Sequence, residues 1–398
     1  MVCRTELANG LVYNYCPNDL PPAADRMQSI VHGRFIDELT GQAVRAPLTV
    51  STEMDYLLPR ATNNGIAGLV ANPMGRFPGL RLNSVDIDMT VAANRYMPRS
   101  FKRSLGPINT SVGAADNYPN FFAAIDLGDV NLHRAASVIK GRCVQDTGAL
   151  SRAPLNNVTV AITGLWRRAP TTDVDPIMVM EPAHIVSLQQ GLYRDRRAGT
   201  DVVRQRDLVP NAGEEKRLLA PVASGDRDCV LSNRLNLVAG NIIAIDSDQA
   251  DLTEYIQISA VDGASTDTQA ARITLAYPLL TQHRANANCV RVIPQVAAAD
   301  NQFFRDAYSR DQSLFLDGLT GLNNSTIEVT DGIGVPEYHN AFLYRVLSDA
   351  DGFFRLPPLT RIAQFQLTAS RADLAQPLVQ VLSPNYDVFE NRADIIFR

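Results

Sequence analysis

The sequence predicts a mainly β protein built from two related modules, the second of which is split by an inserted β-domain. Three observations predict this architecture. Apolar and polar residues alternate over short runs such as SIVHGRFID (29–37), which is typical of half-buried antiparallel strands. The pattern of residues 33–50 returns at 141–160. The continuation of this second copy appears only near the C-terminus, after a long intervening segment.

Composition limits the classes of protein to which the chain can belong. It has 398 residues, 45% of them hydrophobic and 20% charged, which indicates an ordinary globular protein of two or three domains. The net charge of −5 gives no electrostatic reason to expect a nucleic acid or an anionic membrane as partner. No apolar run approaches the roughly 20 residues that a membrane-spanning helix needs. We therefore expect no nucleic-acid partner and no membrane span.

The cysteines and the N-terminal sequence indicate the compartment of assembly. The five cysteines are odd in number and widely scattered, so we expect free thiols in a reducing environment rather than a disulfide framework. The first residues show no basic segment followed by an apolar one, as a secretory signal would. We therefore expect assembly in a bacterial cytoplasm.

Residues 1–28 are interrupted by Pro and Asn and show little periodicity, which predicts an extended arm. The arm contains an apolar run too short to form a core of its own. Its members are candidates for contact with a neighbouring subunit, where a strand-like arm can add to a sheet edge: Leu11, Val12, Tyr13 and Tyr15. The alternative is that the arm wraps around the first module.

The repeat sets the predicted domain boundaries. GRFIDELTGQAVRAPLTV in the first copy matches GRCVQDTGALSRAPLNNVTV in the second. Later segments match in the same order, with NPMGRFPGL answered by DADGFFRLPPL, VDIDMTVAA by IAQFQLTAS and GDVNLHR by ADIIFR. We predict a first β-sandwich at 29–136 and a second, split one at 137–164 and 346–398.

The insertion at 165–345 contains a further predicted β-domain. Short alternating runs separated by Gly, Asp and Asn turns place a small barrel or sandwich at about 220–296. After it, residues 301–321 are a helix candidate, because Phe303, Phe304, Tyr308 and Leu314 approximate a helical spacing. A loop is the alternative for this segment.

The repeated module resembles the carboxypeptidase regulatory-like domain. The resemblance is carried by Gly-Arg, Thr-Gly and Ala-Pro-Leu followed by a strand, and by the segment from Asp351 to Leu359, with 75–80 as its looser counterpart. It implies transthyretin-like β-sandwiches and says little about chemistry. The inserted segment resembles small β-domains of phage tails and contractile injection systems, at Gly240 to Asp246, Glu254 to Ile258 and Ile273 to Leu279.

Motifs for catalysis are missing from the sequence. The five histidines show no zinc-ligand spacing, no cysteine pair has CxxC spacing, and no GxSxG, GxxxxGK or GxGxxG is present. We therefore expect no enzyme and no cofactor. Three closely spaced carboxylates, Asp246, Asp248 and Asp251, are a candidate for Ca²⁺. Exposed turns are rich in Asp for backbone reasons alone, so an ordinary turn is the favoured interpretation.

The stretch YRDRRAGTDVVRQRD (193–207) is dense in arginine. Arginine suits protein interfaces, so Arg194, Arg196 and Arg197 are candidates for contact with an acidic partner surface. A solvated loop is the alternative.

These features favour a structural protein of a phage tail or contractile injection apparatus, at a baseplate or fibre attachment. Its partners would be other protein subunits of a large, oligomeric assembly, and the chain would be a component of a virion or an injection particle. The alternative is a surface or periplasmic adhesin, or carbohydrate-binding protein, built from carboxypeptidase regulatory-like domains.

Overall fold

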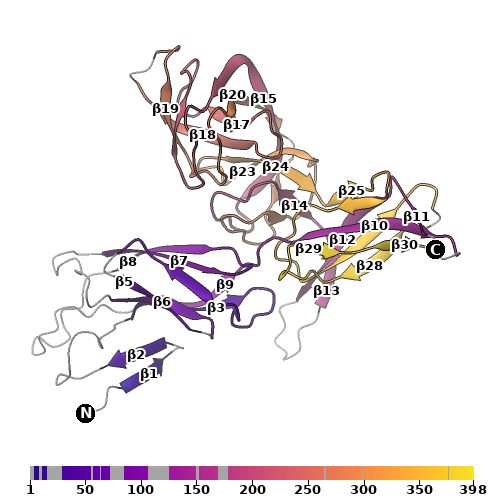
Figure 1. Cartoon of the computed structure of the whole chain (residues 1–398), viewed down its shortest axis with the longest axis horizontal. Helices are drawn as coiled ribbons and strands as arrows, with labels where there is room; N and C mark the ends of the chain where they lie inside the picture. The colour runs from indigo at the N-terminus through magenta and orange to yellow at the C-terminus, as the bar shows by residue number, and fades with distance from the viewer. Residues whose placement is uncertain are drawn as a thin grey trace, which may run out of the picture. The chain divides into compact units, whose positions relative to one another are not determined.

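The computed structural model describes residues 4–8, 11–15, 29–54, 57–62, 64–71, 85–105, 125–148, 152–168, 178–263, 266–297, 299–374 and 376–398. Every regular element in these ranges is a β-strand (Figure 1), which confirms the predicted mainly β class. The chain divides into two compact units, Met1–Ala135 and Ala136–Arg398. The described ranges contain no helix with the length and apolarity required to cross a membrane.

The N-terminal segment contains a β-hairpin. Strands β1 (Arg4–Ala8) and β2 (Leu11–Tyr15) pair in antiparallel fashion, with Ala8 opposite Leu11. The four interface candidates of the arm all lie on β2. They therefore belong to a strand that already has one partner, and the other edge of β2 is paired with no described strand.

The rest of the first unit consists of two sheets, ordered β5-β6-β3-β9 and β4-β7-β8. Strand β9 runs parallel to β3, whereas the remaining pairs are antiparallel. The strand bounds are β3 (Ser29–Asp37), β4 (Leu48–Ser51), β5 (Leu57–Ala61), β6 (Ile66–Ala71), β7 (Val85–Ala93), β8 (Arg99–Leu105) and β9 (Ile125–Leu132).

Both sheets of the first unit contribute to one apolar core. Phe35 and Leu69 come from the four-stranded sheet and Met89 and Val91 from the three-stranded one, and all four are fully buried. Alternation along each strand points every second side chain inward, so two amphipathic sheets can bury their apolar faces together.

The second unit contains two sheets built from strands on both sides of the insertion. In one, β10 is flanked by β11, β26, β29 and β30; the other has the order β13-β12-β27-β28, with β25 also paired to β12. The strand bounds are β10 (Val138–Asp146), β11 (Arg152–Pro154), β12 (Thr159–Arg168), β13 (Met178–Pro182), β25 (Arg345–Leu347), β26 (Phe353–Arg355), β27 (Gln364–Ser370), β28 (Leu378–Leu382), β29 (Glu390–Arg392) and β30 (Ile395–Phe397).

Pairing across the insertion is direct. Cys143 on β10 lies opposite Ile395 on the parallel strand β30, and Val160 on β12 lies opposite Ala369 on β27. All four side chains are buried in one cluster. Residues 137–164 and 346–398 therefore share two sheets and one core, which we call the second sandwich.

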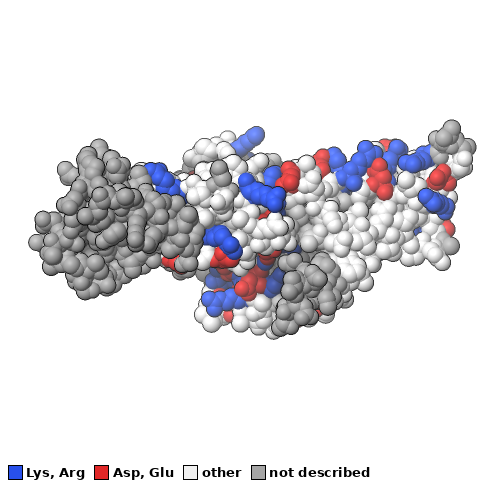
Figure 2. All heavy atoms as spheres, turned by 90° about the horizontal axis from the view of Figure 1, so that it is seen from below, with Lys and Arg blue, Asp and Glu red and all other residues white. Residues whose placement is uncertain are grey.

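The outer face of the β12-β27-β28 sheet carries no charge at its centre. Thr163, Gln366 and Thr368 hydrogen-bond to one another there, with 2.7 Å between the two threonine Oγ1 atoms and 2.9 Å from Gln366 Nε2 to Thr163 Oγ1. Val381 and Val379 continue this face on β28, opposite Gln366 and Thr368. Figure 2 shows a wide area without Lys, Arg, Asp or Glu on the part of the surface formed by the second sandwich.

The insertion contains a six-stranded barrel that closes in the order β15-β20-β17-β18-β24-β23. The closing contact is the pairing of Tyr255 with Tyr338. The strand bounds of the insertion are β14 (Ile185–Leu188), β15 (Val202–Arg217), β16 (Asp228–Leu231), β17 (Ile242–Ile245), β18 (Glu254–Val261), β19 (Ala271–Leu275), β20 (Asn288–Ala297), β21 (Asn301–Gln302), β22 (Ser313–Phe315), β23 (Ser325–Thr330) and β24 (Glu337–Leu343). The barrel therefore extends beyond the predicted 220–296 on both sides.

The helix considered for residues 301–321 is wrong. This segment contains β21 and β22, joined by turns. Phe303 and Leu314 are buried in the core of the insertion, but Phe304, beside Phe303, is exposed. The apolar spacing reflects single anchoring residues in an irregular chain, which periodicity alone cannot distinguish from a helix.

The base of the insertion shares the core of the second sandwich. Ile185 on β14 and Phe315 on β22 belong to the same buried cluster as Leu359 and Phe365. The hydroxyl of Tyr344 lies 2.7 Å from Ser313 Oγ and donates to the Pro358 carbonyl at 2.5 Å. The insertion is therefore joined to its host by packed side chains as well as by two chain crossings.

The three described cysteines, Cys143, Cys229 and Cys289, are buried free thiols. Burial raises the pKa of Cys143 and that of Cys229 to about 12. Such thiols are protonated at neutral pH and act as small apolar side chains.

Candidate functional site

The insertion holds a cluster of buried ionisable side chains centred on His283. His283 Nδ1 lies 2.6 Å from Asp246 Oδ2, and its Nε2 lies 3.0 Å from Glu254 Oε2. All three residues are almost completely buried. Asp246 directly follows β17 and has a φ of +54°, and Glu254 begins the neighbouring strand β18. The two carboxylates thus approach the ring from adjacent strands.

The charges of this cluster stabilise one another. Burial alone would lower the pKa of His283, but its hydrogen bonds to Glu254 and Asp246 outweigh burial and raise that pKa. Burial would raise the pKa of Glu254, yet hydrogen bonds from His283, the Leu280 amide and Thr281 lower it. An imidazolium between two carboxylates satisfies both ring nitrogens as donors.

Tyr193 connects this cluster to a second one. Its hydroxyl donates to Glu254 Oε1 at 2.7 Å, and its backbone N–H donates to Glu337 Oε2 at 2.8 Å. The ring stacks on Tyr277 with centroids 5.2 Å apart. Tyr193 lies in the segment after β14, so one residue links that segment to barrel strands β18 and β24.

The second cluster surrounds Glu337 on β24. Arg196 donates to Glu337 Oε1 at 2.6 Å, and His339 Nε2 lies 3.1 Å from Glu337 Oε2. Burial would raise the pKa of Glu337, but the hydrogen bond from His339 and the nearby positive charges lower it. Arg194 lies at the edge of this cluster, 3.1 Å from Asp331 and 3.6 Å from Glu337.

The geometry of these linked clusters suits structural support better than acid–base chemistry. Thr281 Oγ1 lies 3.1 Å from His283 Nε2, and Asp246 lies on the other side of the ring, which places a hydroxyl, an imidazole and a carboxylate in sequence. A general base needs a nitrogen lone pair directed at the hydroxyl proton. Here Thr281 donates that proton to Glu254 Oε2 at 2.7 Å, and both ring nitrogens of His283 face carboxylates.

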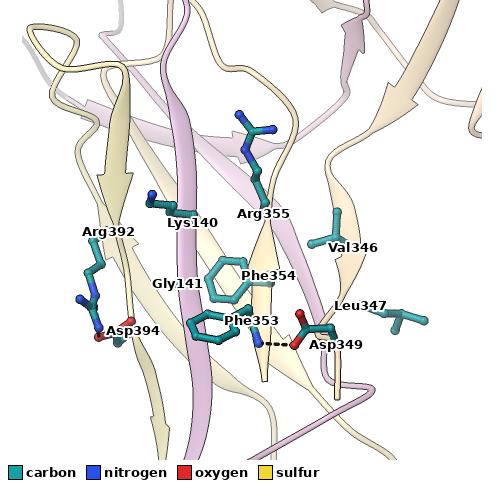
Figure 3. A pocket seen from close by; sticks show the side chains of 10 residues that line it. All are labelled: Lys140, Gly141, Val346, Leu347, Asp349, Phe353, Phe354, Arg355, Arg392 and Asp394. Carbon is teal, nitrogen blue, oxygen red and sulfur yellow. Dashed lines mark hydrogen bonds and ion pairs between the residues drawn. The ribbon is translucent and has the colours of Figure 1, made fainter. Parts of the chain in front are cut away.

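The second sandwich has a groove of about 660 Å³ between β10, β25 and β26 (Figure 3). Phe353 is 52% exposed beside it, and the Arg142 guanidinium lies 5.1 Å from the centroid of that ring. Among the charged residues around the groove, Lys140 pairs with Glu390 and Arg392 pairs with Asp394. The groove thus offers an aromatic surface with an ion-paired rim.

The proposed calcium ligands are not brought together. Asp246 is buried and directed at His283, whereas Asp248 and Asp251 are exposed. Within the described ranges, no group of three or more His, Cys, Asp or Glu side chains has an arrangement that could hold a metal ion. Because the Asp246 carboxylate contacts the buried His283 ring at 2.6 Å, the structure lends the calcium candidate no support, and it stays a prediction.

The three arginine candidates are divided between the interior and the surface. Arg196 is only 1% exposed and is paired inside the chain, so its side chain cannot form part of a contact surface. Arg194 is partly exposed and Arg197 is exposed. A partner contact by this stretch would therefore depend on Arg194 and Arg197.

The buried clusters were missed from the sequence because their members lie far apart in the chain. Asp246 and His283 are separated by 37 positions, and Tyr193 and Glu254 by 61. Glu337 and His339 are the pair whose spacing in the sequence could have indicated their contact. Two residues apart on a strand, they point to the same face, and an acid and an imidazole sharing a buried face need each other as partners.

Comparison with known proteins adds no family assignment: no protein-family model matches the chain, and no curated protein matches it. The resemblances to carboxypeptidase regulatory-like domains and to phage-tail domains therefore stay predictions.

Proposed function

We propose that the chain is a non-enzymatic assembly protein of a phage tail or contractile injection apparatus, at a baseplate or fibre attachment. The proposal that the chain is not an enzyme is supported by the burial and pairing of ionisable side chains among the described residues. The largest linked set, from Asp246 through Glu254 to Glu337, is buried and paired within the chain. The link to this machinery rests on the resemblance of 240–279 to phage-tail domains.

The buried set has a structural consequence that suits an assembly protein. Breaking a buried ion pair is costly because it leaves an uncompensated charge, so paired charges at several strands favour one arrangement of the barrel over others. A subunit that must present a fixed surface to neighbours benefits from this rigidity.

Exposed apolar side chains on edge strands support a role in assembly. Met180 on β13 and both Val379 and Val381 on β28 are each about half exposed, and these strands form the two edges of one sheet. Apolar residues on an open sheet edge are suited to contact with another chain.

An adhesin that binds carbohydrate at a cell surface or in the periplasm is the second candidate, and the groove in Figure 3 favours it. An exposed aromatic ring such as Phe353 offers a face on which a sugar ring can stack.

Locating the protein separates the two candidates. The side chain of Ile333 lies in a turn and is 97% exposed, so an epitope inserted after it should not disturb the core. Antibodies against this epitope can then locate the protein in the encoding bacterium. We expect immunogold labelling at one fixed position on purified tail-like particles, and loss of complete particles when the gene is deleted. Label confined to envelope fractions, with intact particles in the deletion strain, would overturn the proposal.

A glycan array tests the second candidate directly. Carbohydrate binding that is lost in Phe353→Ala and kept in Phe304→Ala, a substitution at a similarly exposed position, would favour the adhesin.

A further inference from the structure

Strand β28 at the edge of the second sandwich has an unpaired side and a palindromic sequence. Among the described strands it pairs only with β27. Its five residues read Leu-Val-Gln-Val-Leu in either direction, with Gln380 at the centre. An edge strand presents unpaired backbone N–H and C=O groups to any chain that can match it.

The side chains of β28 are divided between the core and the surface. Leu378 and Leu382 pack against the core of the second sandwich. Val379 and Val381 point outward and are 51% and 49% exposed. Pro377 and Pro384 flank the strand, and proline cannot donate to a ladder, so the length available for pairing is limited to these few residues.

Within its five residues, β28 lacks the charges and bulges that commonly block edge pairing. Natural edge strands commonly carry a lysine, another charge or a bulge that blocks association, whereas β28 contains none of these and pairs with β27 in unbroken register. The opposite edge of the same sheet, β13, differs because it includes Glu181 and ends at Pro182. Of the two edges, β28 is the one open to pairing along its whole length.

We propose that β28 is a self-association strand, which pairs in antiparallel fashion with β28 of a second copy of this chain. The twofold axis would pass beside Gln380. Val379 would then lie opposite Val381 of the second copy, and Leu378 opposite its Leu382. In such an isologous contact each surface meets itself, and the palindrome means that every residue faces one of its own type.

The second copy is the partner that this strand fits best for two reasons. Like charges opposite one another destabilise a symmetric strand pair, and β28 carries no charge. The uncharged outer face formed by Thr163, Gln366 and Thr368 would continue across the axis into the same face of the second copy. The inference does not depend on which machine, if any, contains the protein.

The first experiment measures the mass of the full chain by light scattering over a wide range of concentration. We expect the mass to rise from 43.5 kDa towards twice that value. The variant Val379→Lys/Val381→Lys should stay at the mass of one chain, because lysines would face lysines across the axis. The control Val209→Lys/Ile293→Lys changes a cross-strand pair with 47% and 40% exposure on the barrel and should associate as the unmodified chain does.

Charge complementation makes the test specific to β28. Val379→Glu/Val381→Glu chains should also be monomeric alone, but mixing them with the lysine variant should restore association as a one-to-one complex, since each lysine then faces a glutamate. A wild-type chain that is monomeric at every concentration would overturn the proposal. So would dimers that persist in the lysine variant, because they would form elsewhere.

Cross-linking checks the register. In a chain whose Cys3 and Cys16 are replaced by serine, Gln380→Cys should form a disulfide-linked dimer on mild oxidation, because two copies of residue 380 meet at the axis. Val209→Cys in the same background measures how much disulfide forms through random collisions between chains. Equal cross-linking at the two positions would contradict the proposed pairing.

Discussion

The carbonyl oxygen of Gly352 accepts a hydrogen bond from the amide of Cys143 at 2.8 Å, across the insertion that separates them in the chain. Gly352 has a φ of +81°, and a Cβ added to it would lie 2.5 Å from the Cys143 carbonyl oxygen. The first unit contains the same arrangement, with 2.6 Å between the Phe35 amide and the Gly65 carbonyl and a Gly65 φ of +76°. Gly65 is therefore a structural counterpart of Gly352, whereas Gly75, the counterpart that the sequence alignment predicted, lies outside the described residues.

Replacing Gly352 by alanine should destabilise the second sandwich. The positive φ alone costs about 1–3 kcal/mol for a residue with a side chain, and the added Cβ would also meet backbone that cannot move aside. We expect a clear fall in melting temperature, measured by circular dichroism. Gly148→Ala is the matched control, since Gly148 has a φ of +78° but open space around its Cβ position. An equal fall in melting temperature in the two variants would show that the close approach to Cys143 contributes nothing to the destabilisation.

The contribution of His283 to stability should depend on pH. Its pKa is raised in the folded chain above the ordinary value of 6.5, so the stability it adds is fully present below pH 6.5 and is lost as the pH rises through the folded pKa. The pKa of Glu254 is lowered below 4.5, so its contribution is present above pH 4.5 and is lost as the pH falls through the folded pKa.

Urea unfolding of the wild type and of His283→Gln tests this pH dependence. The difference in free energy of unfolding should be largest between pH 4.5 and pH 6.5 and should shrink at more alkaline pH. His184→Gln, at a partly exposed position, should change stability little. A difference for His283→Gln that is constant with pH would show that the ring is not held as an imidazolium.

Loss of Arg196 should be far more damaging than loss of its neighbour Arg197. Arg196→Ala leaves Glu337 buried without its 2.6 Å partner, and removing one partner of a buried ion pair costs about 3–5 kcal/mol. Arg197→Ala removes an exposed side chain and should cost little. Chemical denaturation of both variants gives the comparison, and similar midpoints would contradict the buried pairing.

Phe315 in the insertion should stabilise the host sandwich. Phe315→Ala opens a cavity in a core that includes Leu359 and Phe365, and such truncations cost about 3–5 kcal/mol. Hydrogen exchange should therefore quicken at the amides of β12 and β27, far from Phe315 in sequence. Phe304→Ala, at an exposed position of the insertion, should leave these amides protected. Unchanged protection in Phe315→Ala would mean that insertion and host unfold independently.

Much of the fold could be predicted because its signals are local. Alternation along SIVHGRFID predicted a strand at 29–37, and the structure has β3 there. The Thr-Gly pair in each copy of the repeat is typical of a tight turn, and Gly41 and Gly148 have φ values of +68° and +78°. The strand and the two turns each depend on a few adjacent residues, whose steric preferences act before any tertiary contact forms.

The candidate site could not be predicted because its residues meet only after folding. Asp246 was considered as a calcium ligand, and only folding brings its carboxylate to His283, which lies 37 positions away in the chain. Arg196 was considered as a surface residue, and only the closing of the barrel by β23 and β24 around Glu337 buries it. Spacing in the chain carries no signal for such contacts.

By itself, then, the sequence determined many of the strands and turns and the order of the repeated segments, because backbone preference and alternating polarity are properties of short segments. The tertiary structure decided which strands are neighbours: β10 with β26 and β30 across the insertion, and β18 with β24 at the closure of the barrel. It also decided which charges are buried. The pairing of strands and the burial of charges both require that apolar faces be buried and buried polar groups be paired over the whole chain at once. Many strand pairings are compatible with the local preferences of the sequence, and only these global requirements select one of them.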